Sequence, residues 1–278
     1  MRLVGHHSRS TGRIAYSEHV TPSVSFLGHA TTLIEIDGVR VLTDPVLRPR
    51  VTFLHRVVPP APPEMSSVID VVLISHLHHD HCDLPTLATL GAPVVIAPQG
   101  AGGYLRTRGG LANVIELAEG ETTEVQGLIV TAVHADHDGL RPPFGPRAAA
   151  LGFVLTGADG TVYFAGDTDV YPEMAALPMP EATSLDVALL PVWGWGPNLG
   201  PGHMNPQRAV DALELLEPTF AVPIHWGTYF PVGMKLALGG AGKLLLGPPE
   251  EFAALAADRG VSSRILVTAP GQRVAVSP

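Results

Sequence analysis

The chain has a single cysteine, Cys82, among its 278 residues. One cysteine excludes an intrachain disulfide and agrees with a reducing compartment, so the expected location is the cytoplasm. We interpret Cys82 as a small buried residue rather than as a nucleophile or a metal ligand.

Positive charge is also scarce. Lysine and arginine together number 17 against 26 acidic residues, which gives a formal net charge of −9, and no run is rich in basic residues. This balance argues against nucleic-acid binding and against stable association with an anionic membrane. No apolar run approaches the ~20 residues that span a bilayer, and the start at Met1 lacks the apolar stretch of a secretory signal. The expected partner is a small soluble substrate, and a homo-oligomer is compatible with the composition.

Apolar residues are plentiful, at 46% of the chain against 15% charged residues, which is ample for a large core. We expect one domain over residues 1–278, with residues 1–20 as a polar arm that is flexible or packed at an edge. The segment from Arg48 to Glu64 is expected to be a long surface loop, of the kind that often serves as a lid.

Short apolar runs separated by turn signals predict a strand-rich chain with occasional helices. Thr32–Ile36 and Val39–Leu42 flank Asp37-Gly38, which predicts a two-residue hairpin. Asn205 as N-cap and Pro206 at the first helical position predict a helix over Pro206–Leu216. The other predicted strands are Val68–Ile74, Val94–Ala97, Val114–Leu117, Leu128–Val133, Gly152–Leu155, Thr161–Phe164, Val187–Leu190, Phe220–Ile224 and Ile265–Thr268, and the other helices are Leu84–Leu90, Tyr171–Leu177 and Glu250–Ala257. This mixture predicts sheets covered by helices, an α/β layered fold.

The run from His76 to His81 contains four histidines and one aspartate directly after a predicted buried strand. Imidazole nitrogen and carboxylate oxygen are the ligands that zinc and similar ions prefer. In an extended strand end, His76 and His78 share one face, whereas His79 points the other way. Asp80 and His81 follow where the chain must turn, so they can serve a second, adjacent ion. The alternative is a solvated polar loop, which fits less well after a buried strand.

Further histidines and acids follow other predicted strands. His134 and His137 follow Leu128–Val133, Asp167 follows Thr161–Phe164, and His225 follows Phe220–Ile224. Loops at strand ends commonly bring distant residues of a rigid scaffold to one place. We therefore expect these residues to complete the metal site, with Asp167 placed to bridge two ions.

With these motifs the chain resembles the metallo-β-lactamase superfamily of metal-dependent hydrolases, whose signature H-x-H-x-D-H matches His76, His78, Asp80 and His81. Within it, the chain looks like the branch of ascorbate-phosphate lactonases and N-acylphosphatidylethanolamine-hydrolysing phospholipase D. The other matching segments begin at Phe26, Leu42, Gly166, His203 and Pro223. The resemblance implies a four-layer αβ/βα sandwich with two metal ions at one edge of the sheets.

The resemblance also implies a complete set of ligands. The first ion would be held by His76, His78 and a downstream histidine, the second by Asp80, His81 and His225, with Asp167 bridging the two. For the downstream histidine the family pattern favours His137, and His134 stays the alternative. Asp44 would orient a ligand imidazole or simply form a turn, and His29 is expected nearby. The expected ions are divalent transition metals, zinc first, with manganese or iron as alternatives.

The expected function is hydrolysis, because two adjacent cations lower the pKa of a shared water to about 7 and so provide a bridging hydroxide. The substrate would be a small soluble ester, lactone or phosphodiester, and the enzyme a lactonase or a phosphodiesterase. Asp80 would orient the water or carry its proton, and the resemblance assigns His203 to substrate binding or oxyanion stabilisation. The alternative is a metal-binding protein on the same scaffold with a sensing or redox role and no hydrolysis.

Two further features near the expected site stay open. Trp193 and Trp195 lie in a glycine-rich loop, where they would form an apolar wall over the metals or serve as core anchors. Arg141 and Arg147 flank a short loop, and either could pair with an anionic substrate group, although surface arginines usually have no such role.

Overall fold

The computed structural model describes residues 22–179, 183–193, 200–233 and 241–276. The arm predicted over residues 1–20 and the indole of Trp195 lie outside these ranges. Within them, every helix is too short or too polar to cross a lipid bilayer.

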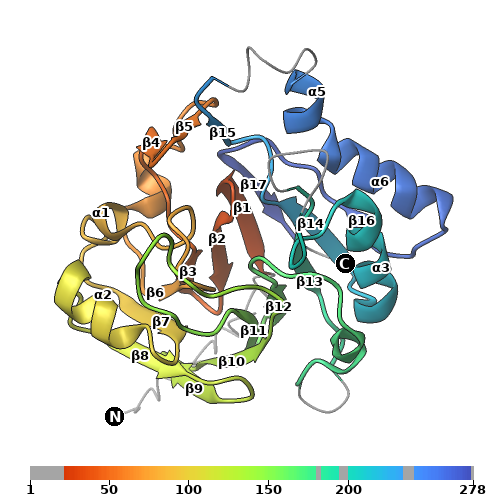
Figure 1. The fold of residues 1–278 in the computed structure, drawn as a ribbon. Helices are drawn as coiled ribbons and strands as arrows, with labels where there is room; N and C mark the ends of the chain where they lie inside the picture. Colours follow the sequence, from red (N-terminus) through yellow and green to blue (C-terminus); the bar gives the residue numbers. More distant parts are fainter. Residues whose placement is uncertain (1–21, 180–182, 194–199, 234–240, 277–278) are drawn as a thin grey trace, which may run out of the picture.

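Two seven-stranded sheets form the centre of the molecule (Figure 1). The first has the spatial order β17-β1-β2-β3-β6-β7-β8 and the second the order β16-β14-β13-β12-β11-β10-β9. The strands of the first sheet are β1 (Ser23–Gly28), β2 (Thr31–Ile36), β3 (Val39–Thr43), β6 (Val71–Leu73), β7 (Val94–Pro98), β8 (Val114–Leu117) and β17 (Gln272–Ala275). Those of the second are β9 (Thr122–Val125), β10 (Leu128–His134), β11 (Leu151–Gly157), β12 (Gly160–Phe164), β13 (Val187–Pro191), β14 (Phe220–Ile224) and β16 (Arg264–Ile265).

Strand direction brings the predicted ligands to one edge. In the first sheet β3, β6, β7 and β8 run parallel, and in the second β12, β13, β14 and β16 do the same. Strand β10 runs in the direction of β12, because each is antiparallel to β11. The carboxyl ends of parallel strands meet at the same edge of a sheet, and loops leaving that edge commonly form binding sites.

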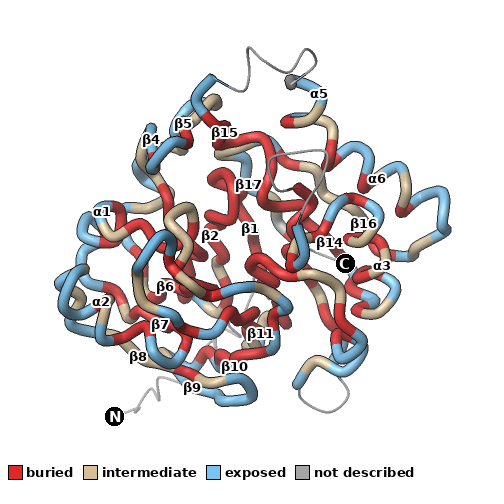
Figure 2. Tube along the Cα trace, viewed as in Figure 1, coloured by how far each residue is buried: buried red, intermediate tan, exposed pale blue. Residues whose placement is uncertain are grey.

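The two sheets pack face to face, with helices on both outer faces (Figure 1). Alternate residues of β6 divide between two cores, because Val71 and Leu73 face the second sheet while Val72 faces the helices α1 (Leu84–Leu87) and α2 (Gly102–Gly109). Helices α3 (Pro206–Leu216) and α6 (Pro248–Asp258) cover the second sheet. The inner strands of both sheets are buried almost throughout, and exposed residues lie mainly on the helices, the loops and the edge strands such as β9 (Figure 2). The predicted four-layer αβ/βα sandwich is thus confirmed.

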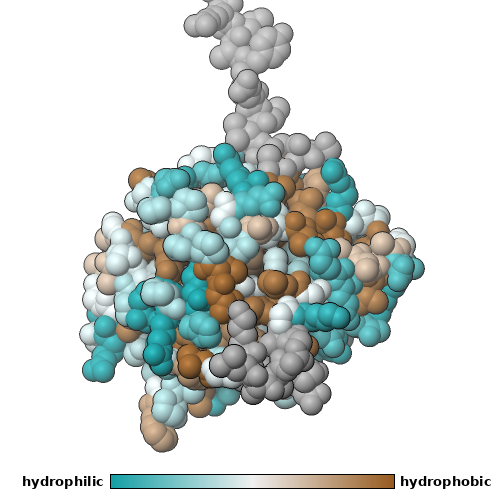
Figure 3. Space-filling model, turned by 90° about the horizontal axis from the view of Figure 1, so that it is seen from above, coloured by the Kyte–Doolittle hydropathy of each residue, from teal (hydrophilic) through white to brown (hydrophobic). Residues whose placement is uncertain are grey.

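The segment from Arg48 to Glu64 is not the continuous loop that was predicted. It contains β4 (Arg50–Val51) and β5 (Leu54–Arg56), which join β15 (Tyr229–Pro231) in a small third sheet. The prediction was wrong because these short strands pair with β15, far away in the sequence. Phe53 and Val232 are exposed at this end, 64% and 58%, and Figure 3 looks down on it and shows hydrophobic side chains among hydrophilic ones.

Predictions of secondary structure were accurate where adjacent residues mark a turn or a helix cap. The hairpin at Asp37-Gly38 and the helix α3 with its Asn205 cap are both confirmed. The helix expected over Tyr171–Leu177 is only a short 3-10 helix, and the strand expected over Ile265–Thr268 ends at Ile265. Among the elements not predicted are β1, β9, β15, β17, α2 and α5 (Ala241–Leu246). Helix α2 starts and ends in glycines and lacks an apolar stripe, which explains why it was missed.

Candidate metal centre

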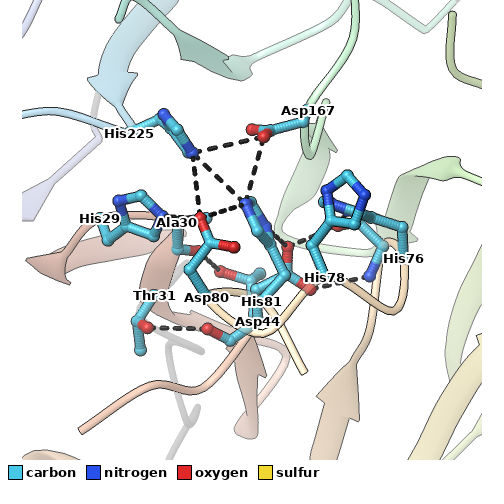
Figure 4. Close-up of polar contacts among 12 residues, drawn as sticks. His29, Ala30, Thr31, Asp44, His76, His78, Asp80, His81, Asp167 and His225 are labelled. Atoms are coloured by element: carbon cyan, nitrogen blue, oxygen red, sulfur yellow. Dashed lines mark hydrogen bonds and ion pairs between the residues drawn. The ribbon is translucent and has the colours of Figure 1, made fainter. Parts of the chain in front are cut away.

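The loop after β6 turns sharply and points most of its polar side chains inward. The N–H groups of His81 and Cys82 both donate to the carbonyl oxygen of His78, over 3.2 and 2.8 Å. Figure 4 shows the side chains of His78, Asp80 and His81 turned toward the other residues of the cluster. His79 is directed elsewhere, because its Nε2 donates to the carbonyl of Pro142, 2.9 Å away. The structure therefore places His79 outside the cluster, as the alternation of side chains predicted.

The first group of potential ligands consists of His76, His78 and His137. One nitrogen from each ring lies within 4.8 Å of the others, and the His78 Nδ1 and His137 Nε2 atoms are 3.2 Å apart. His137 Nδ1 donates to the carbonyl of Gly202 over 2.8 Å, which leaves the lone pair of Nε2 directed into the cluster. A Cβ atom on Gly202 would lie only 3.1 Å from His137 Nδ1, so a glycine permits this contact.

His134 is not in this group. Its ring is 46% exposed and its Nδ1 lies 3.0 Å from a carboxylate oxygen of Glu119 at the surface. Of the two histidines left open by the sequence, the structure brings only His137 to His76 and His78.

The second group contains Asp80, His81 and His225. The two imidazole Nε2 atoms are 3.3 Å apart, and Asp80 Oδ2 lies 3.6 Å from His81 Nε2 and 4.0 Å from His225 Nε2. His225 Nδ1 donates to the carbonyl of Trp193, so its Nε2 also faces the cluster. The family resemblance implied that these three residues share one ion, and the structure brings them together.

Asp167 lies between the two groups (Figure 4). Its Oδ2 is 3.2 Å from His81 Nε2 and 3.3 Å from His225 Nε2. The preceding Gly166 has φ of 62°, and a Cβ atom there would lie 2.6 Å from the Cβ of Ser75. A glycine is therefore needed for the backbone of this loop to come so close to the first sheet.

Two buried atoms of the cluster lack a hydrogen-bond partner among the described residues, His76 Nε2 and Asp167 Oδ1. Buried polar atoms are usually paired, so such orphans require an explanation, and an ion that is not part of the chain is one. Imidazole nitrogens with carboxylate oxygens are a donor set that suits zinc and related divalent ions. The residues present therefore fit a metal.

The buried carboxylate of Asp44 fixes the loop after β6 through hydrogen bonds. Its carboxylate accepts hydrogen bonds from the Ser75 N–H over 2.7 Å, from Ser75 Oγ over 2.5 Å and from His81 Nδ1 over 2.7 Å. The third of these bonds directs the lone pair of His81 Nε2 into the cluster. Between the two readings open for Asp44, a simple turn and an orienting contact, the geometry supports the second.

Protonation differs between the two groups in the absence of a cation. Burial lowers the pKa of His76 well below its usual value, and that of His78 to about 4, so both are neutral near pH 7. Burial would lower the pKa of His81 too, but Asp167 and Asp80 outweigh it and raise this pKa well above its usual value. A cation binding beside His81 must therefore displace a proton.

The sequence did not predict the hydrogen bond between His29 and Asp80 of the second group. His29 was expected only to lie nearby, but its Nε2 donates directly to Asp80 Oδ2 over 2.9 Å. Its backbone also reaches the site, since the carbonyl of His29 accepts from the N–H of His225 over 2.7 Å. The only signal in the sequence was the segment around Gly28-His29, whose positive φ angles of 120° and 59° permit the sharp turn.

His203 approaches the cluster from the loop before α3. Its Nε2 is 3.9 Å from Asp167 Oδ2, its ring centroid is 4.8 Å from that of His137, and its side chain is 29% exposed. Trp193 is 6% exposed and stacks on Phe230 at a centroid distance of 6.2 Å, which supports the core-anchor reading.

Two other expectations can be placed. Cys82 is fully buried, and burial raises the pKa of its thiol to about 12, which favours the structural reading. Arg147 pairs with Asp138 over 2.9 Å, and both side chains are exposed.

Comparison with known proteins places this fold and this cluster in a family. The family model described as the beta-lactamase superfamily domain matches residues 39–226. A metal-dependent hydrolase of Methanopyrus kandleri is 32% identical over 255 residues, which cover 90% of this chain and 97% of the relative. An uncharacterised protein of Mycobacterium tuberculosis is 34% identical over 268 residues, which cover 91% of this chain and 68% of the relative.

A solved structure shows the same architecture. Igni18, a metallo hydrolase from Ignicoccus hospitalis, superposes with a TM-score of 0.69 at 22% identity, over 91% of this chain and 97% of that one. The sequence match, the sandwich and the His/Asp cluster agree with one another. The chain therefore belongs to the metallo-β-lactamase superfamily of metal-dependent hydrolases.

Proposed function

We propose that the protein is a hydrolase with a centre for two divalent transition-metal ions, zinc first. The first ion would be held by His76, His78 and His137, the second by Asp80, His81 and His225, with Asp167 between them. The observation that carries the proposal is the convergence of these groups from four strand ends, with two buried ligand atoms left without a partner among the described residues. The metal-dependent hydrolase of Methanopyrus kandleri, related along nearly its whole length, also supports it.

When bound, the two ions would supply a nucleophilic water near neutral pH and would stabilise negative charge on the reacting oxygen. Asp80 is assigned to orienting that water. Its side chain is 13% exposed, and although burial would raise its pKa, His81 and His29 hold it well below its usual value. Asp80 is therefore a carboxylate at neutral pH, held in place by His29 and able to orient the water by accepting a hydrogen bond from it.

His203 is assigned to the substrate. It is the partly exposed histidine beside Asp167, and its Nδ1 has no partner among the described residues. It also borders a pocket of about 580 Å³ that is lined by Trp193, Arg208, Lys243 and other residues of α3, α5 and α6. A group that projects from this pocket toward the cluster would meet the His203 ring, which could bind it or stabilise an oxyanion.

The pocket supports a small soluble substrate. Its volume lies within the range of about 300 to 1,000 Å³ that is usual for small-molecule sites. The net charge of −9 disfavours a polyanionic partner and a membrane surface, in keeping with a cytoplasmic enzyme. Within the hydrolases we assign a lactonase or a phosphodiesterase, on the resemblance of the motifs.

The test is a panel of lactones and phosphodiesters assayed with the zinc-loaded full chain. Asp167→Ala should lower turnover by about 100-fold or more, since it removes the group placed between both ions. Asp138→Asn is the matched control, because Asp138 is an exposed carboxylate, 58% accessible, in the loop after His137.

Metal analysis accompanies the assay. About two ions per chain are expected in the active wild-type protein. Turnover that does not depend on Asp167, or full activity with less than one ion per chain, would overturn the proposal. Full metal loading without turnover on the panel would favour a metal-binding role on the same scaffold.

A further inference from the structure

Arg141 is a buried cation whose partners carry no formal negative charge. It is 8% exposed. Its Nη1 donates to the carbonyls of Leu77 and Cys82 over 2.7 and 3.0 Å, and its Nη2 donates to His79 Nδ1 over 2.9 Å. Within the described ranges it forms no ion pair. Buried charges are normally neutralised, so this guanidinium lacks a counter-ion.

Arg141 borders a pocket of about 490 Å³ between the β4–β5 turn, α1 and α2. Three arginines line this pocket, Arg48, Arg108 and Arg141, against one carboxylate, Asp83. Arg48 already neutralises Asp83, since its Nε and Nη2 donate to the two carboxylate oxygens over 2.8 and 2.6 Å. Arg108 and Arg141 therefore have no carboxylate partner in this pocket.

Arg108 differs from its neighbour on the same helix. Arg106 pairs with Glu116 over 3.2 Å and does not line the pocket, whereas Arg108 lines it and has no ion pair within the described ranges. Thr52 also lines the pocket and adds a hydroxyl group, whereas the hydroxyl of Thr107 donates to the carbonyl of Gly103 over 2.6 Å. Planar arginine groups with nearby hydroxyls are the usual partners of phosphate-like anions.

We propose that this pocket binds an oxyanion of the phosphate type, with Arg108 and Arg141 as its charged contacts. The pocket is separate from the one beside His203, with which it shares no residue. It lies against the outer side of the ligand loop, because His79 lines it while the flanking His78 and Asp80 belong to the metal cluster. The oxyanion is a free anion or a phosphoryl group on the substrate.

The test is a calorimetric titration of the zinc-loaded full chain with inorganic phosphate. Arg108→Gln should weaken phosphate binding by about tenfold or more, because a charge-assisted contact is lost. Arg106→Gln, on the same exposed helix, should bind as the wild type does. Phosphate held by the metals contributes equally to both variants, so it cannot produce this difference. Equal phosphate affinity in the wild type and Arg108→Gln would overturn the proposal.

Kinetics separate the two sources of the anion. If the phosphoryl group belongs to the substrate, Arg108→Gln should raise KM for a phosphorylated ester and leave KM for its unphosphorylated form unchanged. If the anion is free, phosphate should change turnover of the unphosphorylated ester more in the wild type than in Arg108→Gln, because any phosphate held by the metals affects both equally. The titration needs no turnover, so failure of the hydrolase proposal leaves this test intact.

Discussion

His29 and Asp80 are joined by a hydrogen bond of 2.9 Å between Nε2 and Oδ2, in which the His29 ring is buried and the Asp80 carboxylate is 13% exposed. The backbone of His29 is fixed at both ends, because its N–H donates to Thr228 Oγ1 over 2.8 Å and its carbonyl accepts from His225 over 2.7 Å. Burial lowers the pKa of His29 to about 3, so the ring is a neutral donor. One residue of the β1–β2 turn thus orients two proposed ligands of the second ion.

Replacing this donor should impair the second ion site. His29→Asn suits the φ of 59° at this position and removes the bond to Asp80. We expect a fall of about 10- to 100-fold in turnover or in affinity for the second ion, the usual cost of losing a residue that orients a ligand. His134→Asn, on an exposed ring, is the control for steady-state kinetics and metal analysis. Wild-type values in both assays for His29→Asn would contradict the prediction.

The first ion site should depend on His137 and not on His134. His137→Ala removes one of three converging nitrogens, and we expect the metal content to fall from about two ions per chain to about one, with turnover largely lost. His134→Ala removes only a surface contact to Glu119 and should retain both ions. Atomic emission spectroscopy of protein dialysed against zinc measures the number of ions per chain in the two variants. Loss of metal in His134→Ala alone would reverse the assignment.

Asp44 should matter for stability even without metal. Its carboxylate accepts from two groups of Ser75 and from His81, and an amide at this position would set an N–H against one of these donors. We expect Asp44→Asn to lower the free energy of unfolding of the metal-free chain by about 3 kcal/mol, as for a broken buried pair. Asp138→Asn, at an exposed pair, should cost under about 1 kcal/mol. Guanidinium denaturation of both variants tests this, and equal losses would contradict it.

The metal-free protein should lose stability as the pH falls below about 6.5. The pKa values of His29 and His78 are lowered from 6.5 to about 3 and about 4, so the unfolded chain takes up protons in this range that the folded chain does not. The free energy of unfolding therefore falls with falling pH. His81 has a raised pKa, so its contribution is fully present below pH 6.5 and is lost only as the pH rises through the folded value.

The measurement is the guanidinium midpoint between about pH 7 and about pH 4. The slope of the free energy of unfolding against pH gives the number of protons that the chain takes up on unfolding. In His29→Asn the slope should be shallower, because one of the buried neutral histidines is missing. A midpoint that does not change over this range would refute the prediction.

Features encoded locally could be predicted from the sequence. Side-chain alternation in an extended strand end separated His79 from His76 and His78, and the cap at Asn205 marked the start of α3. Features that depend on distant partners could not be predicted. Strand β5 exists because Arg56 pairs with Tyr229, and the bond from His29 to Asp80 requires the β1–β2 turn to meet the loop after β6.

The choice between His134 and His137 shows the same division. His134 is the last residue of β10 and His137 lies in the loop that follows, and no local rule separates them. What separates them is the neighbourhood of each ring, the carbonyl of Gly202 for His137 and the exposed carboxylate of Glu119 for His134.

The proposed ligands are divided between the two halves of the sandwich. The loop after β6 belongs to the first sheet, whereas Asp167 and His225 follow β12 and β14 of the second. Neither half contains all the ligands, so ions bound there would cross-link the two sheets at their interface. Metal retention would then show whether the two sheets are packed together. Separation of the sheets at this interface would require release of the ions.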